Sequence, residues 1–240
     1  MYVGERRRRA SARRLLLGGA VAALAAGALG VAGWKLSSSE PAESRTLTLA
    51  SAHSCPTPAA AARARVALAA AEARYRLEAR GTTIHRDLSQ IAHDAALVEA
   101  LKAGNLSLAL QAANAQLVRH VVQIRVLNGS RVLLDANPTS FDVGGSSVAL
   151  RAPNGRSLGQ LVITVQDVIG FIKLVHKLDA ADVVVRDSAG HMRTSLPAAA
   201  NVALPSSGCT HIGARTYAVG SFSDTSFTGQ PLTVWVLTAA

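Results

Sequence analysis

The chain has 240 residues, of which 4% are aromatic, so a folded core has to be built mainly from Val, Leu, Ile and Ala. Its formal net charge is +10 at pH 7. Seven basic residues and Glu5 precede residue 36, and 18 Lys and Arg against 14 Asp and Glu follow it. That larger part contains no basic block and no interleaved aromatic residues, so no nucleic-acid partner is expected.

The N-terminus predicts a membrane anchor. Residues 1–14 carry six arginines, and the twenty residues 15–34 contain no charged side chain. Twenty apolar residues form a helix of ~30 Å, which matches the hydrocarbon core of a bilayer, and arginines stay on the cytoplasmic side. We predict a cytoplasmic basic tail over 1–14, a single transmembrane helix over 15–34, a polar linker over 35–58 and an extracytoplasmic domain over 59–240.

The apolar segment leaves two alternatives open. It can be a signal peptide, whose cleavage would release a secreted domain. If it is retained, Gly19, Ala23 and Gly27 lie four residues apart on one helix face. Small residues at this spacing allow two helices to approach closely, which is compatible with a homodimer.

Helical periodicity dominates the first part of the domain. Residues 59–80 are rich in alanine and predict one helix. Apolar residues then recur at three- and four-residue steps from Ile84 to Leu101, which predicts a second helix. Gly104-Asn105 ends it, and residues 106–117 predict a third, shorter helix.

After residue 119 the apolar pattern becomes strand-like. Val122, Ile124 and Val126 alternate with other side chains, and Asn128-Gly129 is a strong hairpin signal. A single helix follows Asp167 and interrupts the strands. The predicted strands are 122–127, 132–134, 147–151, 159–166, 182–187, 191–195, 216–222 and 232–237. These elements predict an α+β domain, in which N-terminal helices pack on one antiparallel sheet of five to six strands.

The order of these elements resembles the Cache (PAS-like) family of extracytoplasmic sensor domains, in particular its stand-alone actinobacterial versions. The similarity rests on His120 to Val126, on the hairpin into Leu133-Leu134-Asp135 and on the run from Leu161 to Val175. It extends over about residues 60–238. The resemblance implies a PAS-like sheet and a small-molecule pocket between that sheet and its covering helices and loops.

The chain has two cysteines, Cys55 and Cys209. An even pair in an oxidising compartment predicts a disulfide, and the alternative is two free thiols. Metal binding by Cys55 with the nearby His53 is not expected, because no further ligands follow at a useful spacing.

Five polar residues are candidate ligand-binding positions. Gln123 and Arg125 share one face of a predicted strand, and together with Arg151 they could receive an anion; the alternative is a solvated sheet face. Gln166 and Asp167 lie where a strand leads into a helix. Asp167 could hold an amine or a cation, or it could cap the helix N-terminus.

These features predict a membrane-anchored sensor domain without a transmitter of its own, which binds an unknown small molecule and acts through a separate membrane signalling partner. The alternative is a structural or adaptor protein of the cell envelope with a closed pocket. The sequence contains no nucleophile elbow, phosphate loop or dinucleotide fingerprint, so neither an enzyme nor a cofactor is expected. An open cavity between sheet and helices, lined by polar groups such as Arg125, Arg151 or Asp167, would favour sensing, and a close-packed apolar interior would count against it.

Overall fold

The computed structural model describes residues 53–117, 120–138 and 141–240. The predicted cytoplasmic tail, the transmembrane helix with its small-residue face and residues 35–52 of the linker lie outside these residues. Among the residues that are described, no helix is both long and apolar enough to cross a membrane.

The longest helix is α1 (Pro58–Arg80), which begins at a side-chain cap. The Thr57 hydroxyl accepts a hydrogen bond from the Ala60 amide at 3.1 Å. The buried face of α1 consists almost entirely of alanine, and small side chains let the helix lie close to the strands it covers. Its buried residues are Ala60, Ala64, Ala67, Ala71, Tyr75 and Ala79.

The strands form two antiparallel sheets, so the prediction of one sheet with five to six strands was wrong. The first sheet has four strands in the order β2-β1-β4-β3, and the second has five in the order β6-β5-β9-β8-β7. The bounds are β1 (Gln123–Asn128), β2 (Arg131–Ala136), β3 (Ser146–Arg151), β4 (Ser157–Thr164), β5 (Asp182–Asp187), β6 (Met192–Thr194), β7 (Ser207–Ile212), β8 (Arg215–Thr225) and β9 (Pro231–Ala239).

The division into two sheets follows from where α5 (Val168–Asp179) takes the chain. This helix leaves the end of β4 and leads into β5, which pairs with β9 and not with a strand of the first sheet. The alternating pattern predicts which segments are strands, but it carries little information about their partners.

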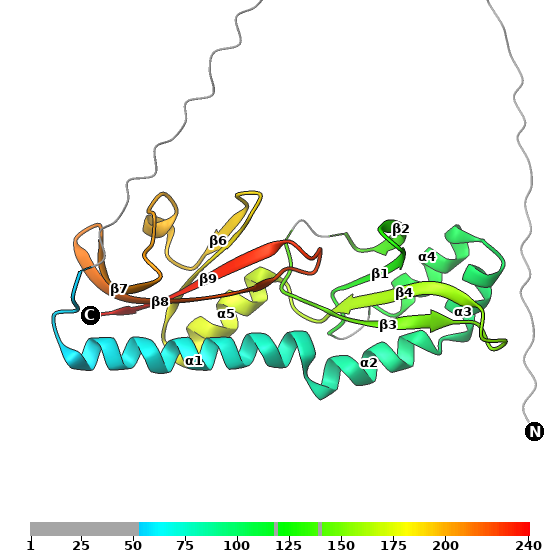
Figure 1. Cartoon of the computed structure of the whole chain (residues 1–240), viewed down its shortest axis with the longest axis horizontal. Helices are drawn as coiled ribbons and strands as arrows, with labels where there is room; N and C mark the ends of the chain where they lie inside the picture. Colours follow the sequence, from blue (N-terminus) through cyan, green and yellow to red (C-terminus); the bar gives the residue numbers. More distant parts are fainter. Residues whose placement is uncertain (1–52, 118–119, 139–140) are drawn as a thin grey trace, which may run out of the picture. The chain divides into compact units, whose positions relative to one another are not determined.

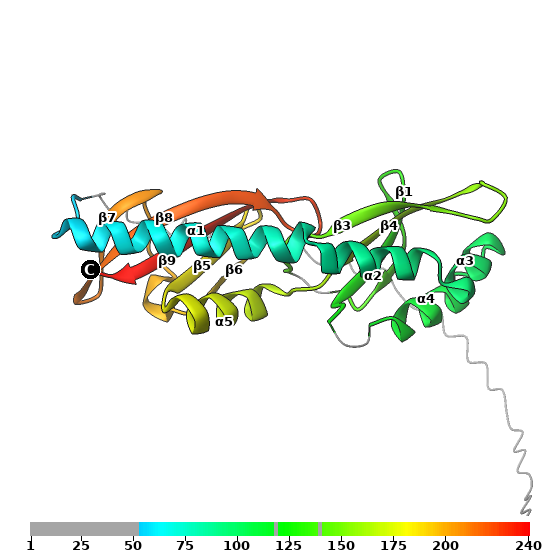
Figure 2. The ribbon, with the colours of Figure 1, turned by 90° about the horizontal axis from the view of Figure 1, so that it is seen from below.

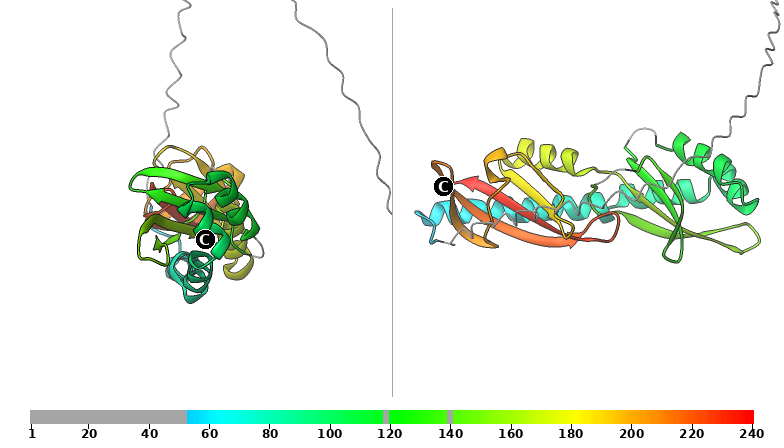
Figure 3. Two further views of the ribbon diagram at one scale, coloured as in Figure 1. Left: turned by 90° about the vertical axis from the view of Figure 1, so that its right-hand side faces the viewer. Right: turned by 90° about the horizontal axis from the view of Figure 1, so that it is seen from above.

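The second sheet is covered by helices on one face. Figure 2 shows α1 and α5 together on the same side of β5 and β9, and Figure 3 shows these strands from the other side. Their side chains form one apolar core in which Tyr75 contacts Phe171 and Phe222 edge to face, with ring centroids 5.6 Å apart in each pair. The opposite face is covered in part by the segment around a short 3-10 helix, Pro197–Ala199.

The predicted helix from Ile84 to Leu101 is divided into α2 (Thr82–Ala92) and α3 (Ala95–Lys102). The break falls at Asp94, whose carboxylate accepts a hydrogen bond from the Leu97 amide at 2.8 Å and caps α3. The next helix, α4 (Leu106–Ala115), begins after a cap from Asn105 in the same manner.

Helices α2, α3 and α4 cover one face of the first sheet. Figure 1 shows α1 running along β8 and β9, and α2 running along β3 and β4. Ile124, Val126 and Leu161 are fully buried in the apolar core between this sheet and its helices. The interior that was predicted to hold a ligand is therefore filled by aliphatic side chains.

Tyr75 connects the two sheets. Its hydroxyl donates to the Thr225 carbonyl at the end of β8 at 2.6 Å and accepts from the Gly144 amide ahead of β3 at 2.8 Å. A side chain at Gly144 would place its Cβ 2.8 Å from the Thr225 carbonyl oxygen, so the close approach requires glycine. The Ser146 hydroxyl also donates to the Ala79 carbonyl at 2.7 Å, and this ties β3 to the end of α1.

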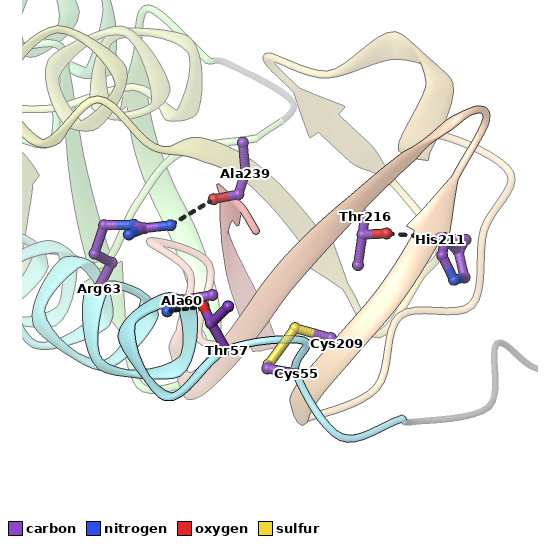
Figure 4. Close-up of a disulfide and its surroundings, with 8 residues drawn as sticks. All are labelled: Cys55, Thr57, Ala60, Arg63, Cys209, His211, Thr216 and Ala239. Atoms are coloured by element: carbon purple, nitrogen blue, oxygen red, sulfur yellow. Dashed lines mark hydrogen bonds between the residues drawn. A yellow bond between two sulfur atoms is a disulfide. The ribbon is translucent and has the colours of Figure 1, made fainter.

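The predicted disulfide between Cys55 and Cys209 is confirmed in the structure. It joins the segment ahead of α1 to β7, as Figure 4 shows. The bond lies beside a small cluster of buried alanines, Ala60, Ala64 and Ala218.

Candidate ligand-binding site

Gln123 and Arg125 do lie together, but they both contact an internal carboxylate. They point to the sheet face opposite the apolar core, where Arg125 pairs across the strands with Asp135. Nε and Nη2 of Arg125 lie 2.9 and 2.6 Å from Asp135 Oδ2, and Gln123 Nε2 lies 2.5 Å from Oδ1. The Arg125 guanidinium also lies 5.1 Å from the centroid of the Phe227 ring. The predicted anion donors therefore have a carboxylate partner within the fold.

Arg151 is not brought to these residues. It lies at the end of β3, exposed, and donates to the Gly155 carbonyl at 3.3 Å within the same hairpin. Its partner on β4 is Ser157, whereas Arg125 pairs with Val162, five residues further along that strand.

Asp167 caps α5. Its Oδ1 accepts a hydrogen bond from the Gly170 amide at 2.5 Å, as the capping alternative predicted. Gln166 lies beside it and donates from Nε2 to the Asp167 carbonyl at 3.4 Å.

The space next to Gln123 is very small. A cavity of about 10 Å³ lies there, with Phe141, Asp142 and Phe227 in its wall. This volume suffices for about one water molecule and not for an organic ligand.

A larger polar cavity lies beside α2. Its volume is about 510 Å³, within the range of small-molecule sites in proteins. It is lined by Arg86, Asp87, Gln90, Ile91, Gln116, His120 and Val121.

The distinctive residue of this cavity is Asp87. It lies on the buried face of α2 beside Leu88, and its side chain is only 9% exposed. A carboxylate is stable at such a position only with partners. Its Oδ2 forms a short hydrogen bond with His120 Nε2, and its Oδ1 lies 3.5 Å from Arg86 Nε. The half-exposed His120 side chain thus connects a buried carboxylate with the cavity.

Another residue of the cavity wall, Gln116, is held by the carboxylate that caps α3. Gln116 Nε2 donates to Oδ2 of Asp94 at 2.8 Å, while the other oxygen of Asp94 caps α3. One carboxylate therefore fixes both the start of a helix and a cavity side chain. Such fixed polar groups reduce the entropy that is lost when a ligand binds.

Glu78, near the end of α1, interacts electrostatically with His120. Burial raises the pKa of Glu78, and the electrostatic interaction with His120 partly offsets this. A raised pKa means that the fold disfavours the ionised form. The contribution of Glu78 to stability is thus greatest below its unfolded pKa of ~4.3 and is lost as the pH rises through the folded value.

Replacing Glu78→Gln is therefore expected to raise the free energy of unfolding at pH 7 by less than ~1 kcal/mol, since Glu78 is partly solvated. The difference from the wild type should vanish near pH 3. Urea unfolding at both pH values measures it, with the exposed Glu99→Gln as control. An equal difference at both pH values would contradict the role of Glu78 ionisation.

The sequence contains one signal for this site. Asp87 interrupts the apolar stripe of Ile84, Leu88 and Ile91, and a carboxylate at a buried position requires a partner. The partner, His120, is 33 residues away, and no spacing rule connects the two.

The cavity offers a carboxylate, a guanidinium, an imidazole and two carboxamides. This set can both donate hydrogen bonds to a polar molecule and accept them from it. Within the described ranges, no three His, Cys, Asp or Glu side chains are placed to hold a metal ion.

Comparisons with known proteins give limited information. No family model and no curated protein matches the chain. Among solved structures, the periplasmic domain of LuxQ from Vibrio cholerae is similar with a TM-score of 0.43 and 10% identity, over 76% of this chain and 99% of that one. The extracellular domain of vpHK1S-Z8, described as a histidine kinase, is similar with a TM-score of 0.42 and 13% identity, over 75% of this chain and 92% of that one. These scores are low, so the function has to be argued from the residues of this chain.

Proposed function

We propose that the chain is a non-enzymatic, membrane-anchored extracytoplasmic domain that binds a small polar molecule and acts through a separate membrane signalling partner. In this proposal residues 15–34 are retained as a single-pass anchor, with the N-terminus in the cytoplasm. The disulfide supports an oxidising compartment for residues 53–240. The cavity on α2 is the binding site.

The observation that carries the proposal is the paired Asp87 at the cavity wall. Burying a carboxylate costs free energy even when it is paired, and an apolar residue on the inner face of α2 would avoid this cost. A buried charge beside a cavity of about 510 Å³ is the kind of group that positions a polar ligand.

A thermal-shift screen tests the proposal. The full chain in detergent would be screened against amines, organic acids, amides and sugars. A ligand at 100 times its dissociation constant adds ~2.7 kcal/mol to the free energy of unfolding. For any compound that stabilises the wild type, we expect Asp87→Asn to weaken the apparent affinity at least tenfold, because the amide lacks the carboxylate charge. The thermal shift at a given ligand concentration should be smaller as a result.

The matched control is Arg151→Ala, which removes an exposed polar side chain at the end of β3. This variant should leave the ligand-induced thermal shift unchanged. A shift that persists in Asp87→Asn and disappears in Arg151→Ala would place the ligand elsewhere and contradict the assignment of the cavity.

The second candidate function is a structural or adaptor protein with a closed pocket. The close-packed apolar interior between the first sheet and α2–α4 favours it. Under this alternative, no compound in the screen should stabilise either the wild type or the Asp87→Asn variant.

A further inference from the structure

A second cavity is lined by one face of α1 and by the hairpin of β7 and β8. Its volume is about 290 Å³, close to the lower end of the range for small-molecule sites. Cys55, from the disulfide drawn in Figure 4, belongs to its wall. The helix contributes Ala61, Ala64, Arg65 and Leu68, which lie three or four residues apart and therefore share one face of α1.

Small residues on both walls leave this space. Ala61 and Ala64 lie on the helix, and Gly208 and Gly220 lie on β7 and β8. Beside the cavity the two elements are in direct contact, because a Cβ at Gly220 would lie only 2.8 Å from Leu68 Cδ2. The cavity is therefore part of a packed contact between helix and sheet, and its size is determined by the side chains that are missing there.

Arg65 is the charged residue of the cavity wall. Along α1, all of which the structure describes, the other arginines have partners within the fold, whereas the exposed guanidinium of Arg65 forms neither a hydrogen bond nor an ion pair. The partners of Arg63, Arg74, Arg76 and Arg80 are, in turn, the Ala239 carbonyl, Asp179, Glu72 and Asp224. Arg65 is thus available to an anion from outside the fold.

The polar groups that accompany Arg65 are hydroxyls. Ser206, Ser207 and Ser221 complete the polar part of the wall, and the Ser221 hydroxyl donates to the Ser206 carbonyl at 3.2 Å. None of the described residues in this wall is acidic. A guanidinium and hydroxyls can donate hydrogen bonds to a carboxylate, and no nearby carboxylate of the wall competes for them.

We propose that this cavity binds a short-chain aliphatic carboxylate. Its carboxylate pairs with Arg65, and its chain fills the apolar space beside Ala61, Leu68 and Val219. Because an exposed ion pair contributes little free energy, most of the affinity comes from the buried chain. At ~30 Å³ for each water-sized group, the cavity holds roughly ten non-hydrogen atoms, which corresponds to an acid of about eight carbons.

This site is separate from the cavity at Asp87 and does not depend on the proposed function. The two sites also differ in chemistry, since the wall at Asp87 combines a buried carboxylate with carboxamides, whereas the wall at Arg65 is apolar with one cation.

Isothermal titration calorimetry with unbranched acids tests the proposal. The full chain in lipid nanodiscs is titrated at neutral pH with butanoate, hexanoate, octanoate and dodecanoate, and the heat measured with empty nanodiscs is subtracted. We expect the affinity to rise about fourfold for each added methylene group up to octanoate and to level off beyond it, because the cavity is then full. Octan-1-ol, which lacks the charge, should bind at least threefold more weakly than octanoate.

Two variants locate the binding site. Arg65→Gln should weaken octanoate binding at least threefold, while the control Arg76→Gln, which removes an exposed arginine of the same helix, should leave it unchanged. Ala61→Leu fills the cavity with a residue that also favours a helix, and it should abolish octanoate binding while the circular dichroism spectrum stays that of the wild type.

Absence of octanoate binding to the wild type would overturn the proposal. Octan-1-ol that binds as tightly as octanoate would contradict a carboxylate ligand. An unchanged affinity for octanoate in either Arg65→Gln or Ala61→Leu would show that the acid binds elsewhere, in the lipid or at another surface, and would equally overturn the assignment of this cavity.

Discussion

Replacing both cysteines, in Cys55→Ser/Cys209→Ser, is expected to lower the free energy of unfolding by ~4–5 kcal/mol. The bond closes a loop with a sequence separation of 154, which contains most of the described residues. Without it the unfolded chain gains the entropy of an open loop, and the folded chain loses a covalent link between α1 and the second sheet. For a domain of this size, the Tm should fall by roughly 10 °C or more.

Urea unfolding followed by circular dichroism measures this effect. The exposed Ser54→Ala, in the same segment, is the control and should change the free energy of unfolding by less than ~0.5 kcal/mol. Reduced wild type should match the double-serine variant. A double variant as stable as the oxidised wild type would show that packing around Ala60, Ala64 and Ala218 suffices to hold this end of the fold.

Replacing Tyr75→Phe is expected to lower the free energy of unfolding by ~2–3 kcal/mol. The change keeps the aromatic contacts with Phe171 and Phe222 but removes the hydroxyl. The amide of Gly144 then lacks its acceptor in a buried position, and the Thr225 carbonyl lacks its donor. Burial raises the pKa of Tyr75, so the hydroxyl stays protonated and can donate throughout the stable pH range.

Urea unfolding measures the cost, with Tyr217→Phe, another buried tyrosine of the second sheet, as the matched control. Hydrogen exchange adds a local measurement. In Tyr75→Phe the Gly144 amide should exchange faster, while the exchange rates of amides inside β9 should change no more than the lower global stability accounts for. A loss of stability below ~0.5 kcal/mol would mean that water replaces the hydroxyl at the junction.

The positions of most elements were predictable because local patterns specify them. The Asn128-Gly129 hairpin, the cap at Asp167 and the alanine-rich helix α1 all lie where the sequence placed them. Hydrophobic periodicity and capping residues act over a few positions, so they can be identified without knowledge of the fold.

Strand β7 was missed because its local pattern is weak. It contains Gly208, with φ of +104°, and begins with the polar Ser207. It is a strand because β8 offers a full set of backbone partners along its length. Pairing with a neighbouring strand, and not intrinsic preference, determines its conformation.

The predicted ligand-binding residues illustrate a different limit. Alternation correctly placed Gln123 and Arg125 on one face. It could not show that β2 would place Asp135 opposite Arg125 and neutralise the expected anion site. Similarly, nothing local connects Asp87 with His120, which meet only because α2 packs on the sheet whose strand β1 follows His120.

By itself, the sequence determined the α+β class, the order of most helices and strands and the pairing of the two cysteines, since each depends on short-range patterns or on a choice between only two residues. Only the tertiary structure decided that the strands form two sheets, that the interior beside the first sheet is filled, and that a polar cavity forms at Asp87. These features depend on contacts between residues far apart in the chain, whose partners are selected by the packing of the whole domain.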